Sequence, residues 1–335
     1  MKVSILITAY NIVSYIAETL DSVLMQKTNF PYEILVGDDG SSDGTKAVIE
    51  SYQEKYPDKI RLYVMPREEG IVYNRVERSA ANRLNLLEHA EGEYVSFLDG
   101  DDYYLSDCRL QKMVDILDDP VNKDCIMCAH NLSMVYEDHP ADSHPLSRAR
   151  VERKYTRRQY WKWMFLQSNG FLFRNIYREF SPTENARRYF DDNNITYWLF
   201  QYGKLYYIPE CLGAYRQVAG SSWNAIGRIQ KACSNMIGYS VELELNGKEQ
   251  RISDIRHFPD YGYLFRHRKE LTPEVCSPFY ETAKENDLKE ALKVYCMKDA
   301  GAVQYLRFAM RYMYSFCGYY FSRLQRAALK CFGRY

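Results

Sequence analysis

The chain has 335 residues, with 44 lysines and arginines balanced by 44 aspartates and glutamates. This neutral total argues against nucleic-acid binding through bulk positive charge, and a composition that is 46% hydrophobic and 26% charged excludes disorder and collagen. Lys2 leads directly into a strand-like run with no visible signal peptide, so the nine cysteines are expected to be free thiols in a reducing cytosol.

Strand and helix patterns alternate strictly over the first 130 residues. Short apolar runs predict strands at residues 2–8, 32–36, 60–64 and 94–98. Helical spacing of apolar residues predicts helices between them, at residues 16–24, 45–56, 76–89 and 110–119. Ser14 is the predicted N-cap of the first helix. This order indicates an α/β fold with a mostly parallel sheet and helices on both faces.

Polar residues follow the carboxyl ends of three predicted strands. They are Tyr10, the pair Asp38-Asp39, and the acidic residues 99–102. In open α/β sheets, ligands bind outside the carboxyl ends of the strands. The topology therefore predicts that these groups, far apart in the sequence, form one site.

Each of the two acidic turns permits a functional and a structural interpretation. Residues 99–102 (Asp-Gly-Asp-Asp) suit Mg²⁺ or Mn²⁺, which take carboxylate oxygens together with substrate phosphates and water. The alternative is a polar turn that is simply acidic. Residues 37–45 carry carboxylates that can accept hydrogen bonds from a ribose or a base N–H, whereas Asp43 and Thr45 are also ordinary helix-capping residues. Taken alone, neither motif decides between the two.

Three segments together carry a family resemblance. Residues 3–11 (VSILITAYN), 36–45 (VGDDGSSDGT) and 92–102 (GEYVSFLDGDD) resemble glycosyltransferase family 2 in order and spacing. The close resemblance covers residues 1–130, with a thinner match over residues 160–223. It implies the GT-A fold, which is Rossmann-like, and a nucleotide-diphosphate sugar as the donor.

The resemblance also implies roles for individual residues of the first half. Thr8, Tyr10 and Asp39 would contact the nucleotide base, and Asp99 would contact the ribose. Asp101 would bind Mn²⁺ or Mg²⁺ and so bridge to the diphosphate, and Asp102 would assist as a metal ligand or support it. Arg83 is the candidate for a further nucleotide contact; Arg75 and Arg78 on the same helix are alternatives, and a solvated helix face remains open for all three.

An acidic pair in the second half is similar to the pair that opens a helix in inverting members of the family. By that similarity, Asp192 would be the catalytic base and would take the proton from an acceptor hydroxyl. Asp191 is a natural helix cap. General-base catalysis of this kind contributes about 10²–10⁴-fold in rate.

One departure from the family pattern concerns the metal. Many relatives read Tyr-Arg-x-His-x-Gly-Ser after the strand of the second half, and this chain has Val218 in place of the histidine. Val218 cannot coordinate a cation, so metal binding would rest on Asp101 and the substrate. Arg216 becomes a candidate phosphate contact, and His130 is expected to be a core or rim residue.

The end of the chain differs from the rest in charge. Residues 301–335 carry six basic side chains and no acidic one, and apolar and aromatic residues recur there at helical spacing. A basic amphipathic helix of this kind favours peripheral contact with an anionic bilayer, and the alternative is a terminal helix packed on the body. The chain contains no uncharged apolar run long enough to span a membrane.

The expected protein is a cytoplasmic, metal-dependent, inverting glycosyltransferase of the hexosyltransferase type. It would transfer a sugar, with a UDP-sugar favoured, to a polysaccharide or lipid-linked glycan at the inner face of the plasma membrane. The alternative is a membrane-associated scaffold or binding module that keeps the fold without turnover. The predicted division is a nucleotide-sugar-binding half (1–130), an acceptor-binding half (131–224), a helical extension (225–300) and the basic tail (301–335).

Overall fold

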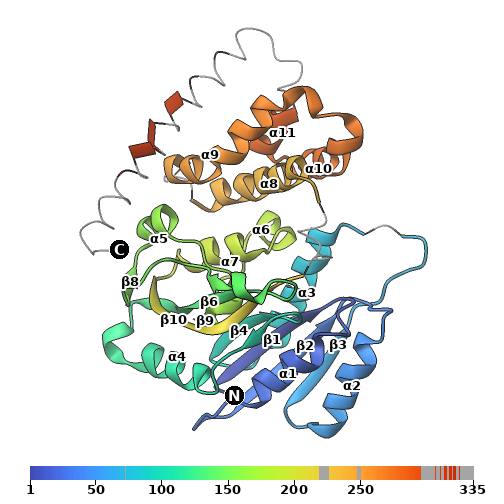
Figure 1. Cartoon of the computed structure of the whole chain (residues 1–335), viewed down its shortest axis with the longest axis vertical. Helices are drawn as coiled ribbons and strands as arrows, with labels where there is room; N and C mark the ends of the chain where they lie inside the picture. Colours follow the sequence, from blue (N-terminus) through green and yellow to red (C-terminus); the bar gives the residue numbers. More distant parts are fainter. Residues whose placement is uncertain are drawn as a thin grey trace. The chain divides into compact units, whose positions relative to one another are not determined.

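The computed structural model describes residues 1–71, 73–218, 226–246 and 250–295, together with isolated positions between residues 306 and 324. The chain divides into two compact units, and Figure 1 labels most of their helices and strands. The first comprises Met1–Arg157 and Phe165–Val218. The second comprises Arg158–Met164 and Ala219–Tyr335.

The first unit is built on a mixed sheet of ten strands. Four parallel neighbours, in the order β3-β2-β1-β4, form its first part. They are β1 (Val3–Ala9), β2 (Tyr32–Asp38), β3 (Ile60–Val64) and β4 (Tyr94–Asp99). Every residue of β2 is buried, as expected for a strand covered on both faces.

Strand β9 (Phe171–Arg174) reverses direction within this sheet. It pairs antiparallel with β4 and with β6 (Cys125–Tyr136), and β6 pairs parallel with β10 (Lys204–Gln217). β6 and β10 therefore run in the same direction as β4, and their carboxyl ends point to the same edge. Because β9 runs the other way, the residues that precede it also lie at that edge. Three short strands complete the sheet: β5 (Tyr103–Tyr104), β7 (His144–Pro145) and β8 (Arg153–Tyr155).

Helices flank the sheet because each buries an apolar face (Figure 1). In α1 (Ile16–Leu24), for example, Ile16, Leu20 and Val23 are fully buried. The other helices of this unit are α2 (Thr45–Lys55), α3 (Arg75–His89), α4 (Arg109–Asp118), α6 (Glu184–Arg188) and α7 (Asp192–Leu199). Short 3₁₀ turns lie at η1 (Pro120–Asn122), η2 (Pro140–Asp142) and η3 (Ser168–Gly170). The predicted α/β fold class is confirmed.

One local prediction was wrong. Helix α1 has Tyr15 at its N-cap with no side-chain cap bond, so Ser14 does not cap it. Strand β10 runs unbroken from Lys204 to Gln217, because a register shift between Ile208 and Cys211 accommodates Pro209 and Glu210. Proline lacks the N–H that a strand ladder needs, and a bulge lets the strand continue past it.

The second unit is helical in its described part. Helix α8 (Arg228–Asn246) packs against three others, α9, α10 and α11. The remaining elements are α5 (Arg157–Trp163, in this unit from Arg158), α9 (Gln250–Arg266), η5 (Arg268–Glu270), α10 (Pro273–Glu285) and α11 (Lys289–Tyr295). None of the helices in the described ranges has the length and apolar character to cross a bilayer. Most of the predicted tail, residues 301–335, lies outside the described residues.

Candidate functional site

Three strand ends meet at one edge of the sheet. The Asp39 N–H donates to the Ala9 carbonyl at 2.9 Å, and the Gly100 N–H donates to the Thr8 carbonyl at 2.8 Å. These bonds join the segments that follow β1, β2 and β4. The structure therefore brings together the polar groups that the topology predicts to meet.

Asp39 lies between two arginines. Arg78 Nε donates to Asp39 Oδ1 at 2.7 Å, and Arg67 Nη2 donates to Asp39 Oδ2. The Arg67 guanidinium also lies over the ring of Tyr10, 4.1 Å from its centroid, and Tyr10 is 42% exposed. A carboxylate flanked by guanidiniums, beside an accessible aromatic ring, forms a flat polar recognition surface.

The other acidic residues after β2 serve the loop itself. Asp38 Oδ2 accepts from the Ser41 N–H at 3.0 Å, and Asp43 accepts from the Thr45 and Val13 N–H groups, each at 3.0 Å. Although burial opposes it, hydrogen bonding led by the Thr45 side chain lowers the pKa of Asp43. The capping interpretation thus applies to Asp43, whereas Asp39 faces the arginines.

Asp99 ends β4 and accepts hydrogen bonds on both carboxylate oxygens. Thr8 Oγ1 and Arg83 Nη2 donate to Oδ1 at 3.0 Å and 3.2 Å, and Gln167 Nε2 donates to Oδ2 at 3.3 Å. Thr8 and Asp99 come from separate motifs and are direct partners in the structure. Each carboxylate oxygen has two lone pairs, so Asp99 retains capacity for a ligand hydroxyl.

The two aspartates that follow Gly100 have different surroundings. Asp102 is 1% exposed; its Oδ1 accepts from the Arg216 N–H at 2.7 Å, and its Oδ2 accepts from Asn169 Nδ2. Burial and the neighbouring Asp101 and Asp99 raise the pKa of Asp102 well above its usual range. Burial, followed by the charge of Asp99, raises the pKa of Asp101 to about 6. No side chain in the described ranges donates to the Asp101 carboxylate, whereas Asp102 ties the turn to β10.

A divalent cation fits this turn chemically. Asp99 and Asp101 repel each other electrostatically, and a cation beside them relieves that repulsion. Mg²⁺ is usually held by one or two carboxylates, with substrate phosphates and water as the remaining ligands. In the part of the chain that the structure describes, no group of three or more His, Cys, Asp or Glu forms a metal cage. Asp101 would therefore supply only part of a coordination shell.

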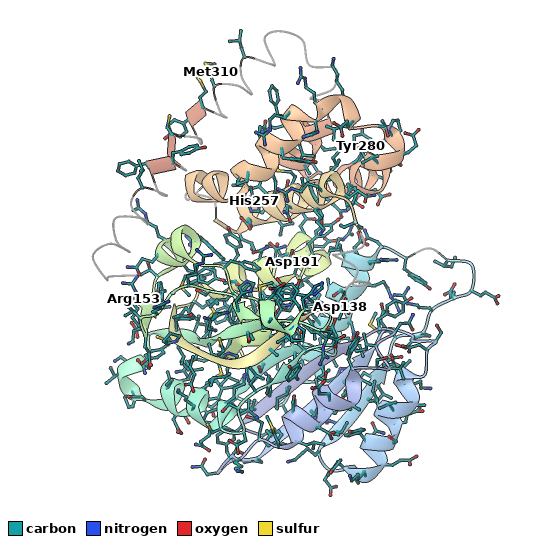
Figure 2. All side chains as sticks on the ribbon, in the orientation of Figure 1. Asp138, Arg153, Asp191, His257, Tyr280 and Met310 are labelled. Atoms are coloured by element: carbon teal, nitrogen blue, oxygen red, sulfur yellow. The ribbon has the colours of Figure 1, made fainter. Side chains whose placement is uncertain are left out.

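Asp191 and Asp192 begin helix α7, and Figure 2 labels Asp191. The Asp191 carboxylate caps the helix by accepting from the Asn194 N–H at 2.9 Å, as predicted. Asp192 Oδ1 accepts from Ser168 Oγ and lies 3.5 Å from Arg83 Nη2. Burial raises the pKa of Asp192, and the positive charge of Arg83 acts in the opposite direction.

The three candidate arginines of α3 have different environments. Arg75 is exposed, and Arg78 holds Asp39. Arg83 is 7% exposed and bridges Asp99 and Asp192. Although burial disfavours its charge, these two carboxylates raise the pKa of Arg83, so it remains a cation between them.

Arg216 is fully engaged by the protein. Its Nε donates to the Asp101 carbonyl at 2.8 Å, its Nη2 donates to Glu18 at 2.6 Å, and its Nη1 donates to Glu137. Only 9% of its side chain is exposed. Arg216 therefore holds the acidic turn in place and has no unengaged nitrogen for the suggested phosphate contact.

The remaining expectations for this region concern His130 and the family motif after Arg216. His130 is completely buried, its Nε2 accepts from Arg109 Nε at 2.7 Å, and burial lowers its pKa well below the usual range. It is a core residue, as predicted. Gly220 and Ser221, which complete the motif, lie outside the described residues.

Sequence reasoning missed two parts of the site. Arg67 follows β3 in a loop where a charged residue is ordinarily solvated, so no pattern singled it out. Gln167, Ser168 and Asn169 are 6%, 0% and 1% exposed, and each bonds to an acidic residue of the site. The available signal was a polar triplet and a glycine directly before an apolar strand.

Comparison with known proteins identifies the relatives of this chain. The model of glycosyl transferase family 2 matches residues 4–180. Uncharacterized protein Rv1520 of Mycobacterium tuberculosis is 29% identical over 233 residues, which are 66% of this chain and 60% of the relative. The glycosyltransferase TuaG of Bacillus subtilis, whose name places it in teichuronic acid biosynthesis, is 31% identical over 136 residues, 41% of this chain and 48% of TuaG. The chain thus spans about 60% of the length of the first relatives it matches.

A solved structure shares the fold. Residues 1–349 of TarS from Staphylococcus aureus, in complex with UDP-GlcNAc, superpose with a TM-score of 0.58 at 17% identity, covering 88% of this chain and 90% of TarS 1–349. This likeness agrees with the GT-A fold that the family resemblance implies. The family model also covers more than half of the chain, so the chain belongs to glycosyl transferase family 2.

Proposed function

We propose that the chain is an inverting, metal-dependent glycosyltransferase of the hexosyltransferase type. It transfers a sugar from a nucleotide-diphosphate donor, with a UDP-sugar favoured, to a polysaccharide or lipid-linked glycan acceptor. One observation carries the proposal: Arg83 Nη2 lies 3.2 Å from Asp99 Oδ1 and 3.5 Å from Asp192 Oδ1. The Arg83 guanidinium therefore lies between Asp99, assigned to the donor ribose, and Asp192, assigned to the acceptor's proton.

The surroundings of Asp39 favour uracil as the base. Arg67 Nη2 and Arg78 Nε already donate to Asp39, and in the described ranges Nη1 of each guanidinium has no hydrogen-bond partner. These two Nη1 donors flank the Asp39 acceptor, and this order complements the acceptor, donor and acceptor of the pairing edge of uracil. The pairing edges of guanine and cytosine would each place at least one donor against a protein donor or one acceptor against a protein acceptor. Sites built from hydrogen-bonding groups strongly reject ligands that leave those groups unpaired. Tyr10 supplies an aromatic face on which a base stacks.

The donor's ribose and diphosphate are assigned to the end of β4. Asp99, oriented by Thr8, accepts from the ribose hydroxyls. Asp101 would hold Mn²⁺ or Mg²⁺, and Asp102 would assist by fixing the turn against β10. When bound, the cation neutralises charge on the departing diphosphate.

Asp192 is assigned to the acceptor's proton. As the acceptor oxygen forms its bond to the sugar C1, its proton passes to the Asp192 carboxylate. The bond between C1 and the diphosphate oxygen breaks on the opposite face, and its electron pair leaves with the diphosphate. An in-line displacement of this kind inverts the configuration at C1.

The acceptor is assigned by class. We place donor binding in residues 1–130 and acceptor binding in residues 131–224, with residues 225–300 as a helical extension. The match to TuaG, which is named for teichuronic acid biosynthesis, supports a surface polysaccharide or its lipid-linked precursor as the acceptor.

The donor assignment predicts which nucleotides stabilise the protein. UDP with Mn²⁺ is expected to raise the melting temperature most, TDP less, and GDP or CDP not at all, because only uracil and thymine match the Arg67–Asp39–Arg78 edge. At 100 times its dissociation constant, a ligand adds about 2.7 kcal/mol of stability. Differential scanning fluorimetry with Mn²⁺ or a chelator measures this. Stabilisation by GDP alone contradicts the base assignment, and no stabilisation by any nucleotide contradicts the transferase assignment.

The tail is assigned to peripheral contact with the inner face of the plasma membrane. Its described apolar side chains are 46% to 68% exposed. They are Leu306, Met310, Met313, Tyr314, Tyr320, Phe321 and Leu324. The six basic residues of the tail suit anionic lipids. Packing of the tail on the body is the alternative.

This assignment predicts that the full chain sediments with vesicles containing phosphatidylglycerol and not with neutral phosphatidylcholine vesicles. The double variant Met310→Glu/Leu324→Glu is expected to lose most of that binding, because it places two charges on the apolar face. Equal sedimentation of variant and wild type would contradict membrane contact through the tail.

A further inference from the structure

Three consecutive side chains before β9 bond to three different acidic residues. Gln167 Nε2 donates to Asp99 Oδ2 at 3.3 Å, Ser168 Oγ donates to Asp192 Oδ1, and Asn169 Nδ2 donates to Asp102 Oδ2. The carbonyl oxygen of the Asn169 amide also accepts from the Asp99 N–H at 3.0 Å. One short turn therefore touches three of the carboxylates to which the reaction is assigned.

The local geometry explains how neighbouring residues reach separate partners. Ser168 and Asn169 belong to the 3₁₀ turn η3, with Gln167 at its N-cap. A 3₁₀ helix has three residues per turn, so consecutive side chains point about 120° apart. The reversed direction of β9 places this turn at the carboxyl edge of its parallel neighbours, where the acidic residues lie.

The buried side chain of Arg109 holds the backbone of the turn by hydrogen bonds. Arg109 is fully buried, and its Nη2 donates to the Asn169 carbonyl at 3.1 Å and to the Phe171 carbonyl at 3.3 Å. Gly170 is required for close packing, because an added Cβ would lie 2.9 Å from the His130 carbonyl oxygen. The turn is therefore a rigid support for its three side chains.

The contacts of Asp192 are asymmetric. Both the Ser168 hydroxyl and the Arg83 guanidinium approach Oδ1. The Ser168 backbone N–H also bonds to the carboxylate. In the described ranges, no side chain donates to Oδ2, and about a quarter of the Asp192 side chain is exposed. The side chains of Ser168 and Arg83 thus orient the carboxylate through Oδ1, and no side chain competes for the lone pairs of Oδ2.

We propose that the turn formed by Gln167, Ser168 and Asn169 is the positioning element of the reaction. It fixes the donor-binding carboxylate and the proton-accepting carboxylate relative to each other. It also anchors Asp192 through Oδ1, so that Oδ2 receives the acceptor's proton. This inference rests on the proposed function for the roles of Asp99 and Asp192. Gln167, Ser168 and Asn169 are positioning residues, since each acts through a carboxylate. Gln167 positions Asp99, which is assigned to the donor, and Ser168 positions Asp192, which is assigned as the proton acceptor.

The charges around Asp192 set the expected effect of losing Ser168. The charged groups that face Asp192 are Arg83 on α3, Asp99 at the end of β4, its neighbour Asp191, and the hydroxyl of Tyr215 on β10. Burial and Asp99 oppose the ionised carboxylate, whereas Arg83, the Ser168 hydroxyl and the Ser168 backbone N–H favour it. A hydrogen bond to a charged group corresponds to roughly one to two pH units in the titration of that group.

The experiment compares two neighbouring variants that the proposal separates. Ser168→Ala is expected to lower kcat, to leave the donor KM unchanged, and to move the acid limb of the pH–rate profile upward by about one to two pH units. Gln167→Met is expected to raise the donor KM and to leave the acid limb in place. Ser168→Cys keeps a weak donor of similar size and is expected to be intermediate. Ser147→Ala is the control, because Ser147 is a buried serine whose hydroxyl, among the described residues, accepts only from the Ala149 N–H.

Two results would overturn the proposal. The first is an acid limb of the pH–rate profile at the same pH in Ser168→Ala and wild type. The second is that Ser168→Ala and Gln167→Met change the same parameter, whether kcat, the donor KM or the acid limb, by the same amount. A turn that had only become looser would produce this second result. Infrared difference spectroscopy of the Asp192 carboxyl, with Asp192→Asn for subtraction, reads the titration without turnover. A shifted Asp192 titration with no transfer from any UDP-sugar would keep the positioning role and reject the proposed function.

Discussion

Replacing Asp192 by Asn is expected to abolish sugar transfer and to leave nucleotide binding intact. The amide has the shape of the carboxylate and its oxygen still accepts from Ser168, but it cannot take a proton from the acceptor. Loss of a general base lowers kcat by about 10²–10⁴-fold. UDP release in the presence of acceptor measures the rate, and calorimetric titration with UDP measures binding.

Asp191→Asn is the matched control for this variant. Asn is as good an N-cap as Asp, so α7 keeps its start and the rate is expected to stay near that of the wild type. Equal losses in the two variants would assign the effect to the helix terminus rather than to proton transfer. A scaffold without turnover would show no change in partner binding in either variant.

Replacing Arg83 by Met is expected to remove transfer and to destabilise the first unit. The substitution leaves the carboxylates of Asp99 and Asp192 without the cation that lies between them. Removing one partner of a buried ion pair costs about 3–5 kcal/mol. For a unit of this size, that loss lowers the melting temperature by about 6–20 °C.

The loss of folding stability in the Arg83→Met variant is expected to depend on pH. Without the guanidinium, the pKa of Asp192 rises further, so the folded variant takes up a proton that the unfolded chain does not take up until lower pH. The stability gap between variant and wild type is therefore largest at neutral pH and narrows as the pH falls. Thermal unfolding followed by circular dichroism at several pH values measures the gap.

Arg75→Met is the matched control on the same helix. Arg75 is exposed at the start of α3, and a surface substitution of this kind changes the free energy of unfolding by less than about 0.5 kcal/mol. A gap of constant size across pH, or an equal loss in the Arg75 variant, would contradict the bridging role of Arg83.

Topology explains why much of this site was predictable. The alternation of strands and helices placed Tyr10, Asp39 and Asp99 at one sheet edge before any contact was known, and the structure joins the three strand ends there. The cap at Asp191 and the burial of His130 followed from local chemistry in the same way. Such features depend on neighbours in sequence or on the general rule for strand direction.

The parts that escaped prediction depend on long-range pairing. The turn at residues 167–169 reaches the site only because β9 runs against its neighbours, and a four-residue strand carries no mark of its direction. Arg67 reaches Asp39 only through the path of the loop after β3. Among the arginines of α3, spacing alone could not separate Arg83 from Arg75, because burial is decided by what packs above the helix.

The chain passes from the second unit back into the first just before this turn. Residues 158–164 belong to the second unit, the first resumes at Phe165, and Gln167 follows two residues later. Only two residues of backbone therefore separate the second unit from the side chains that hold Asp99 and Asp192.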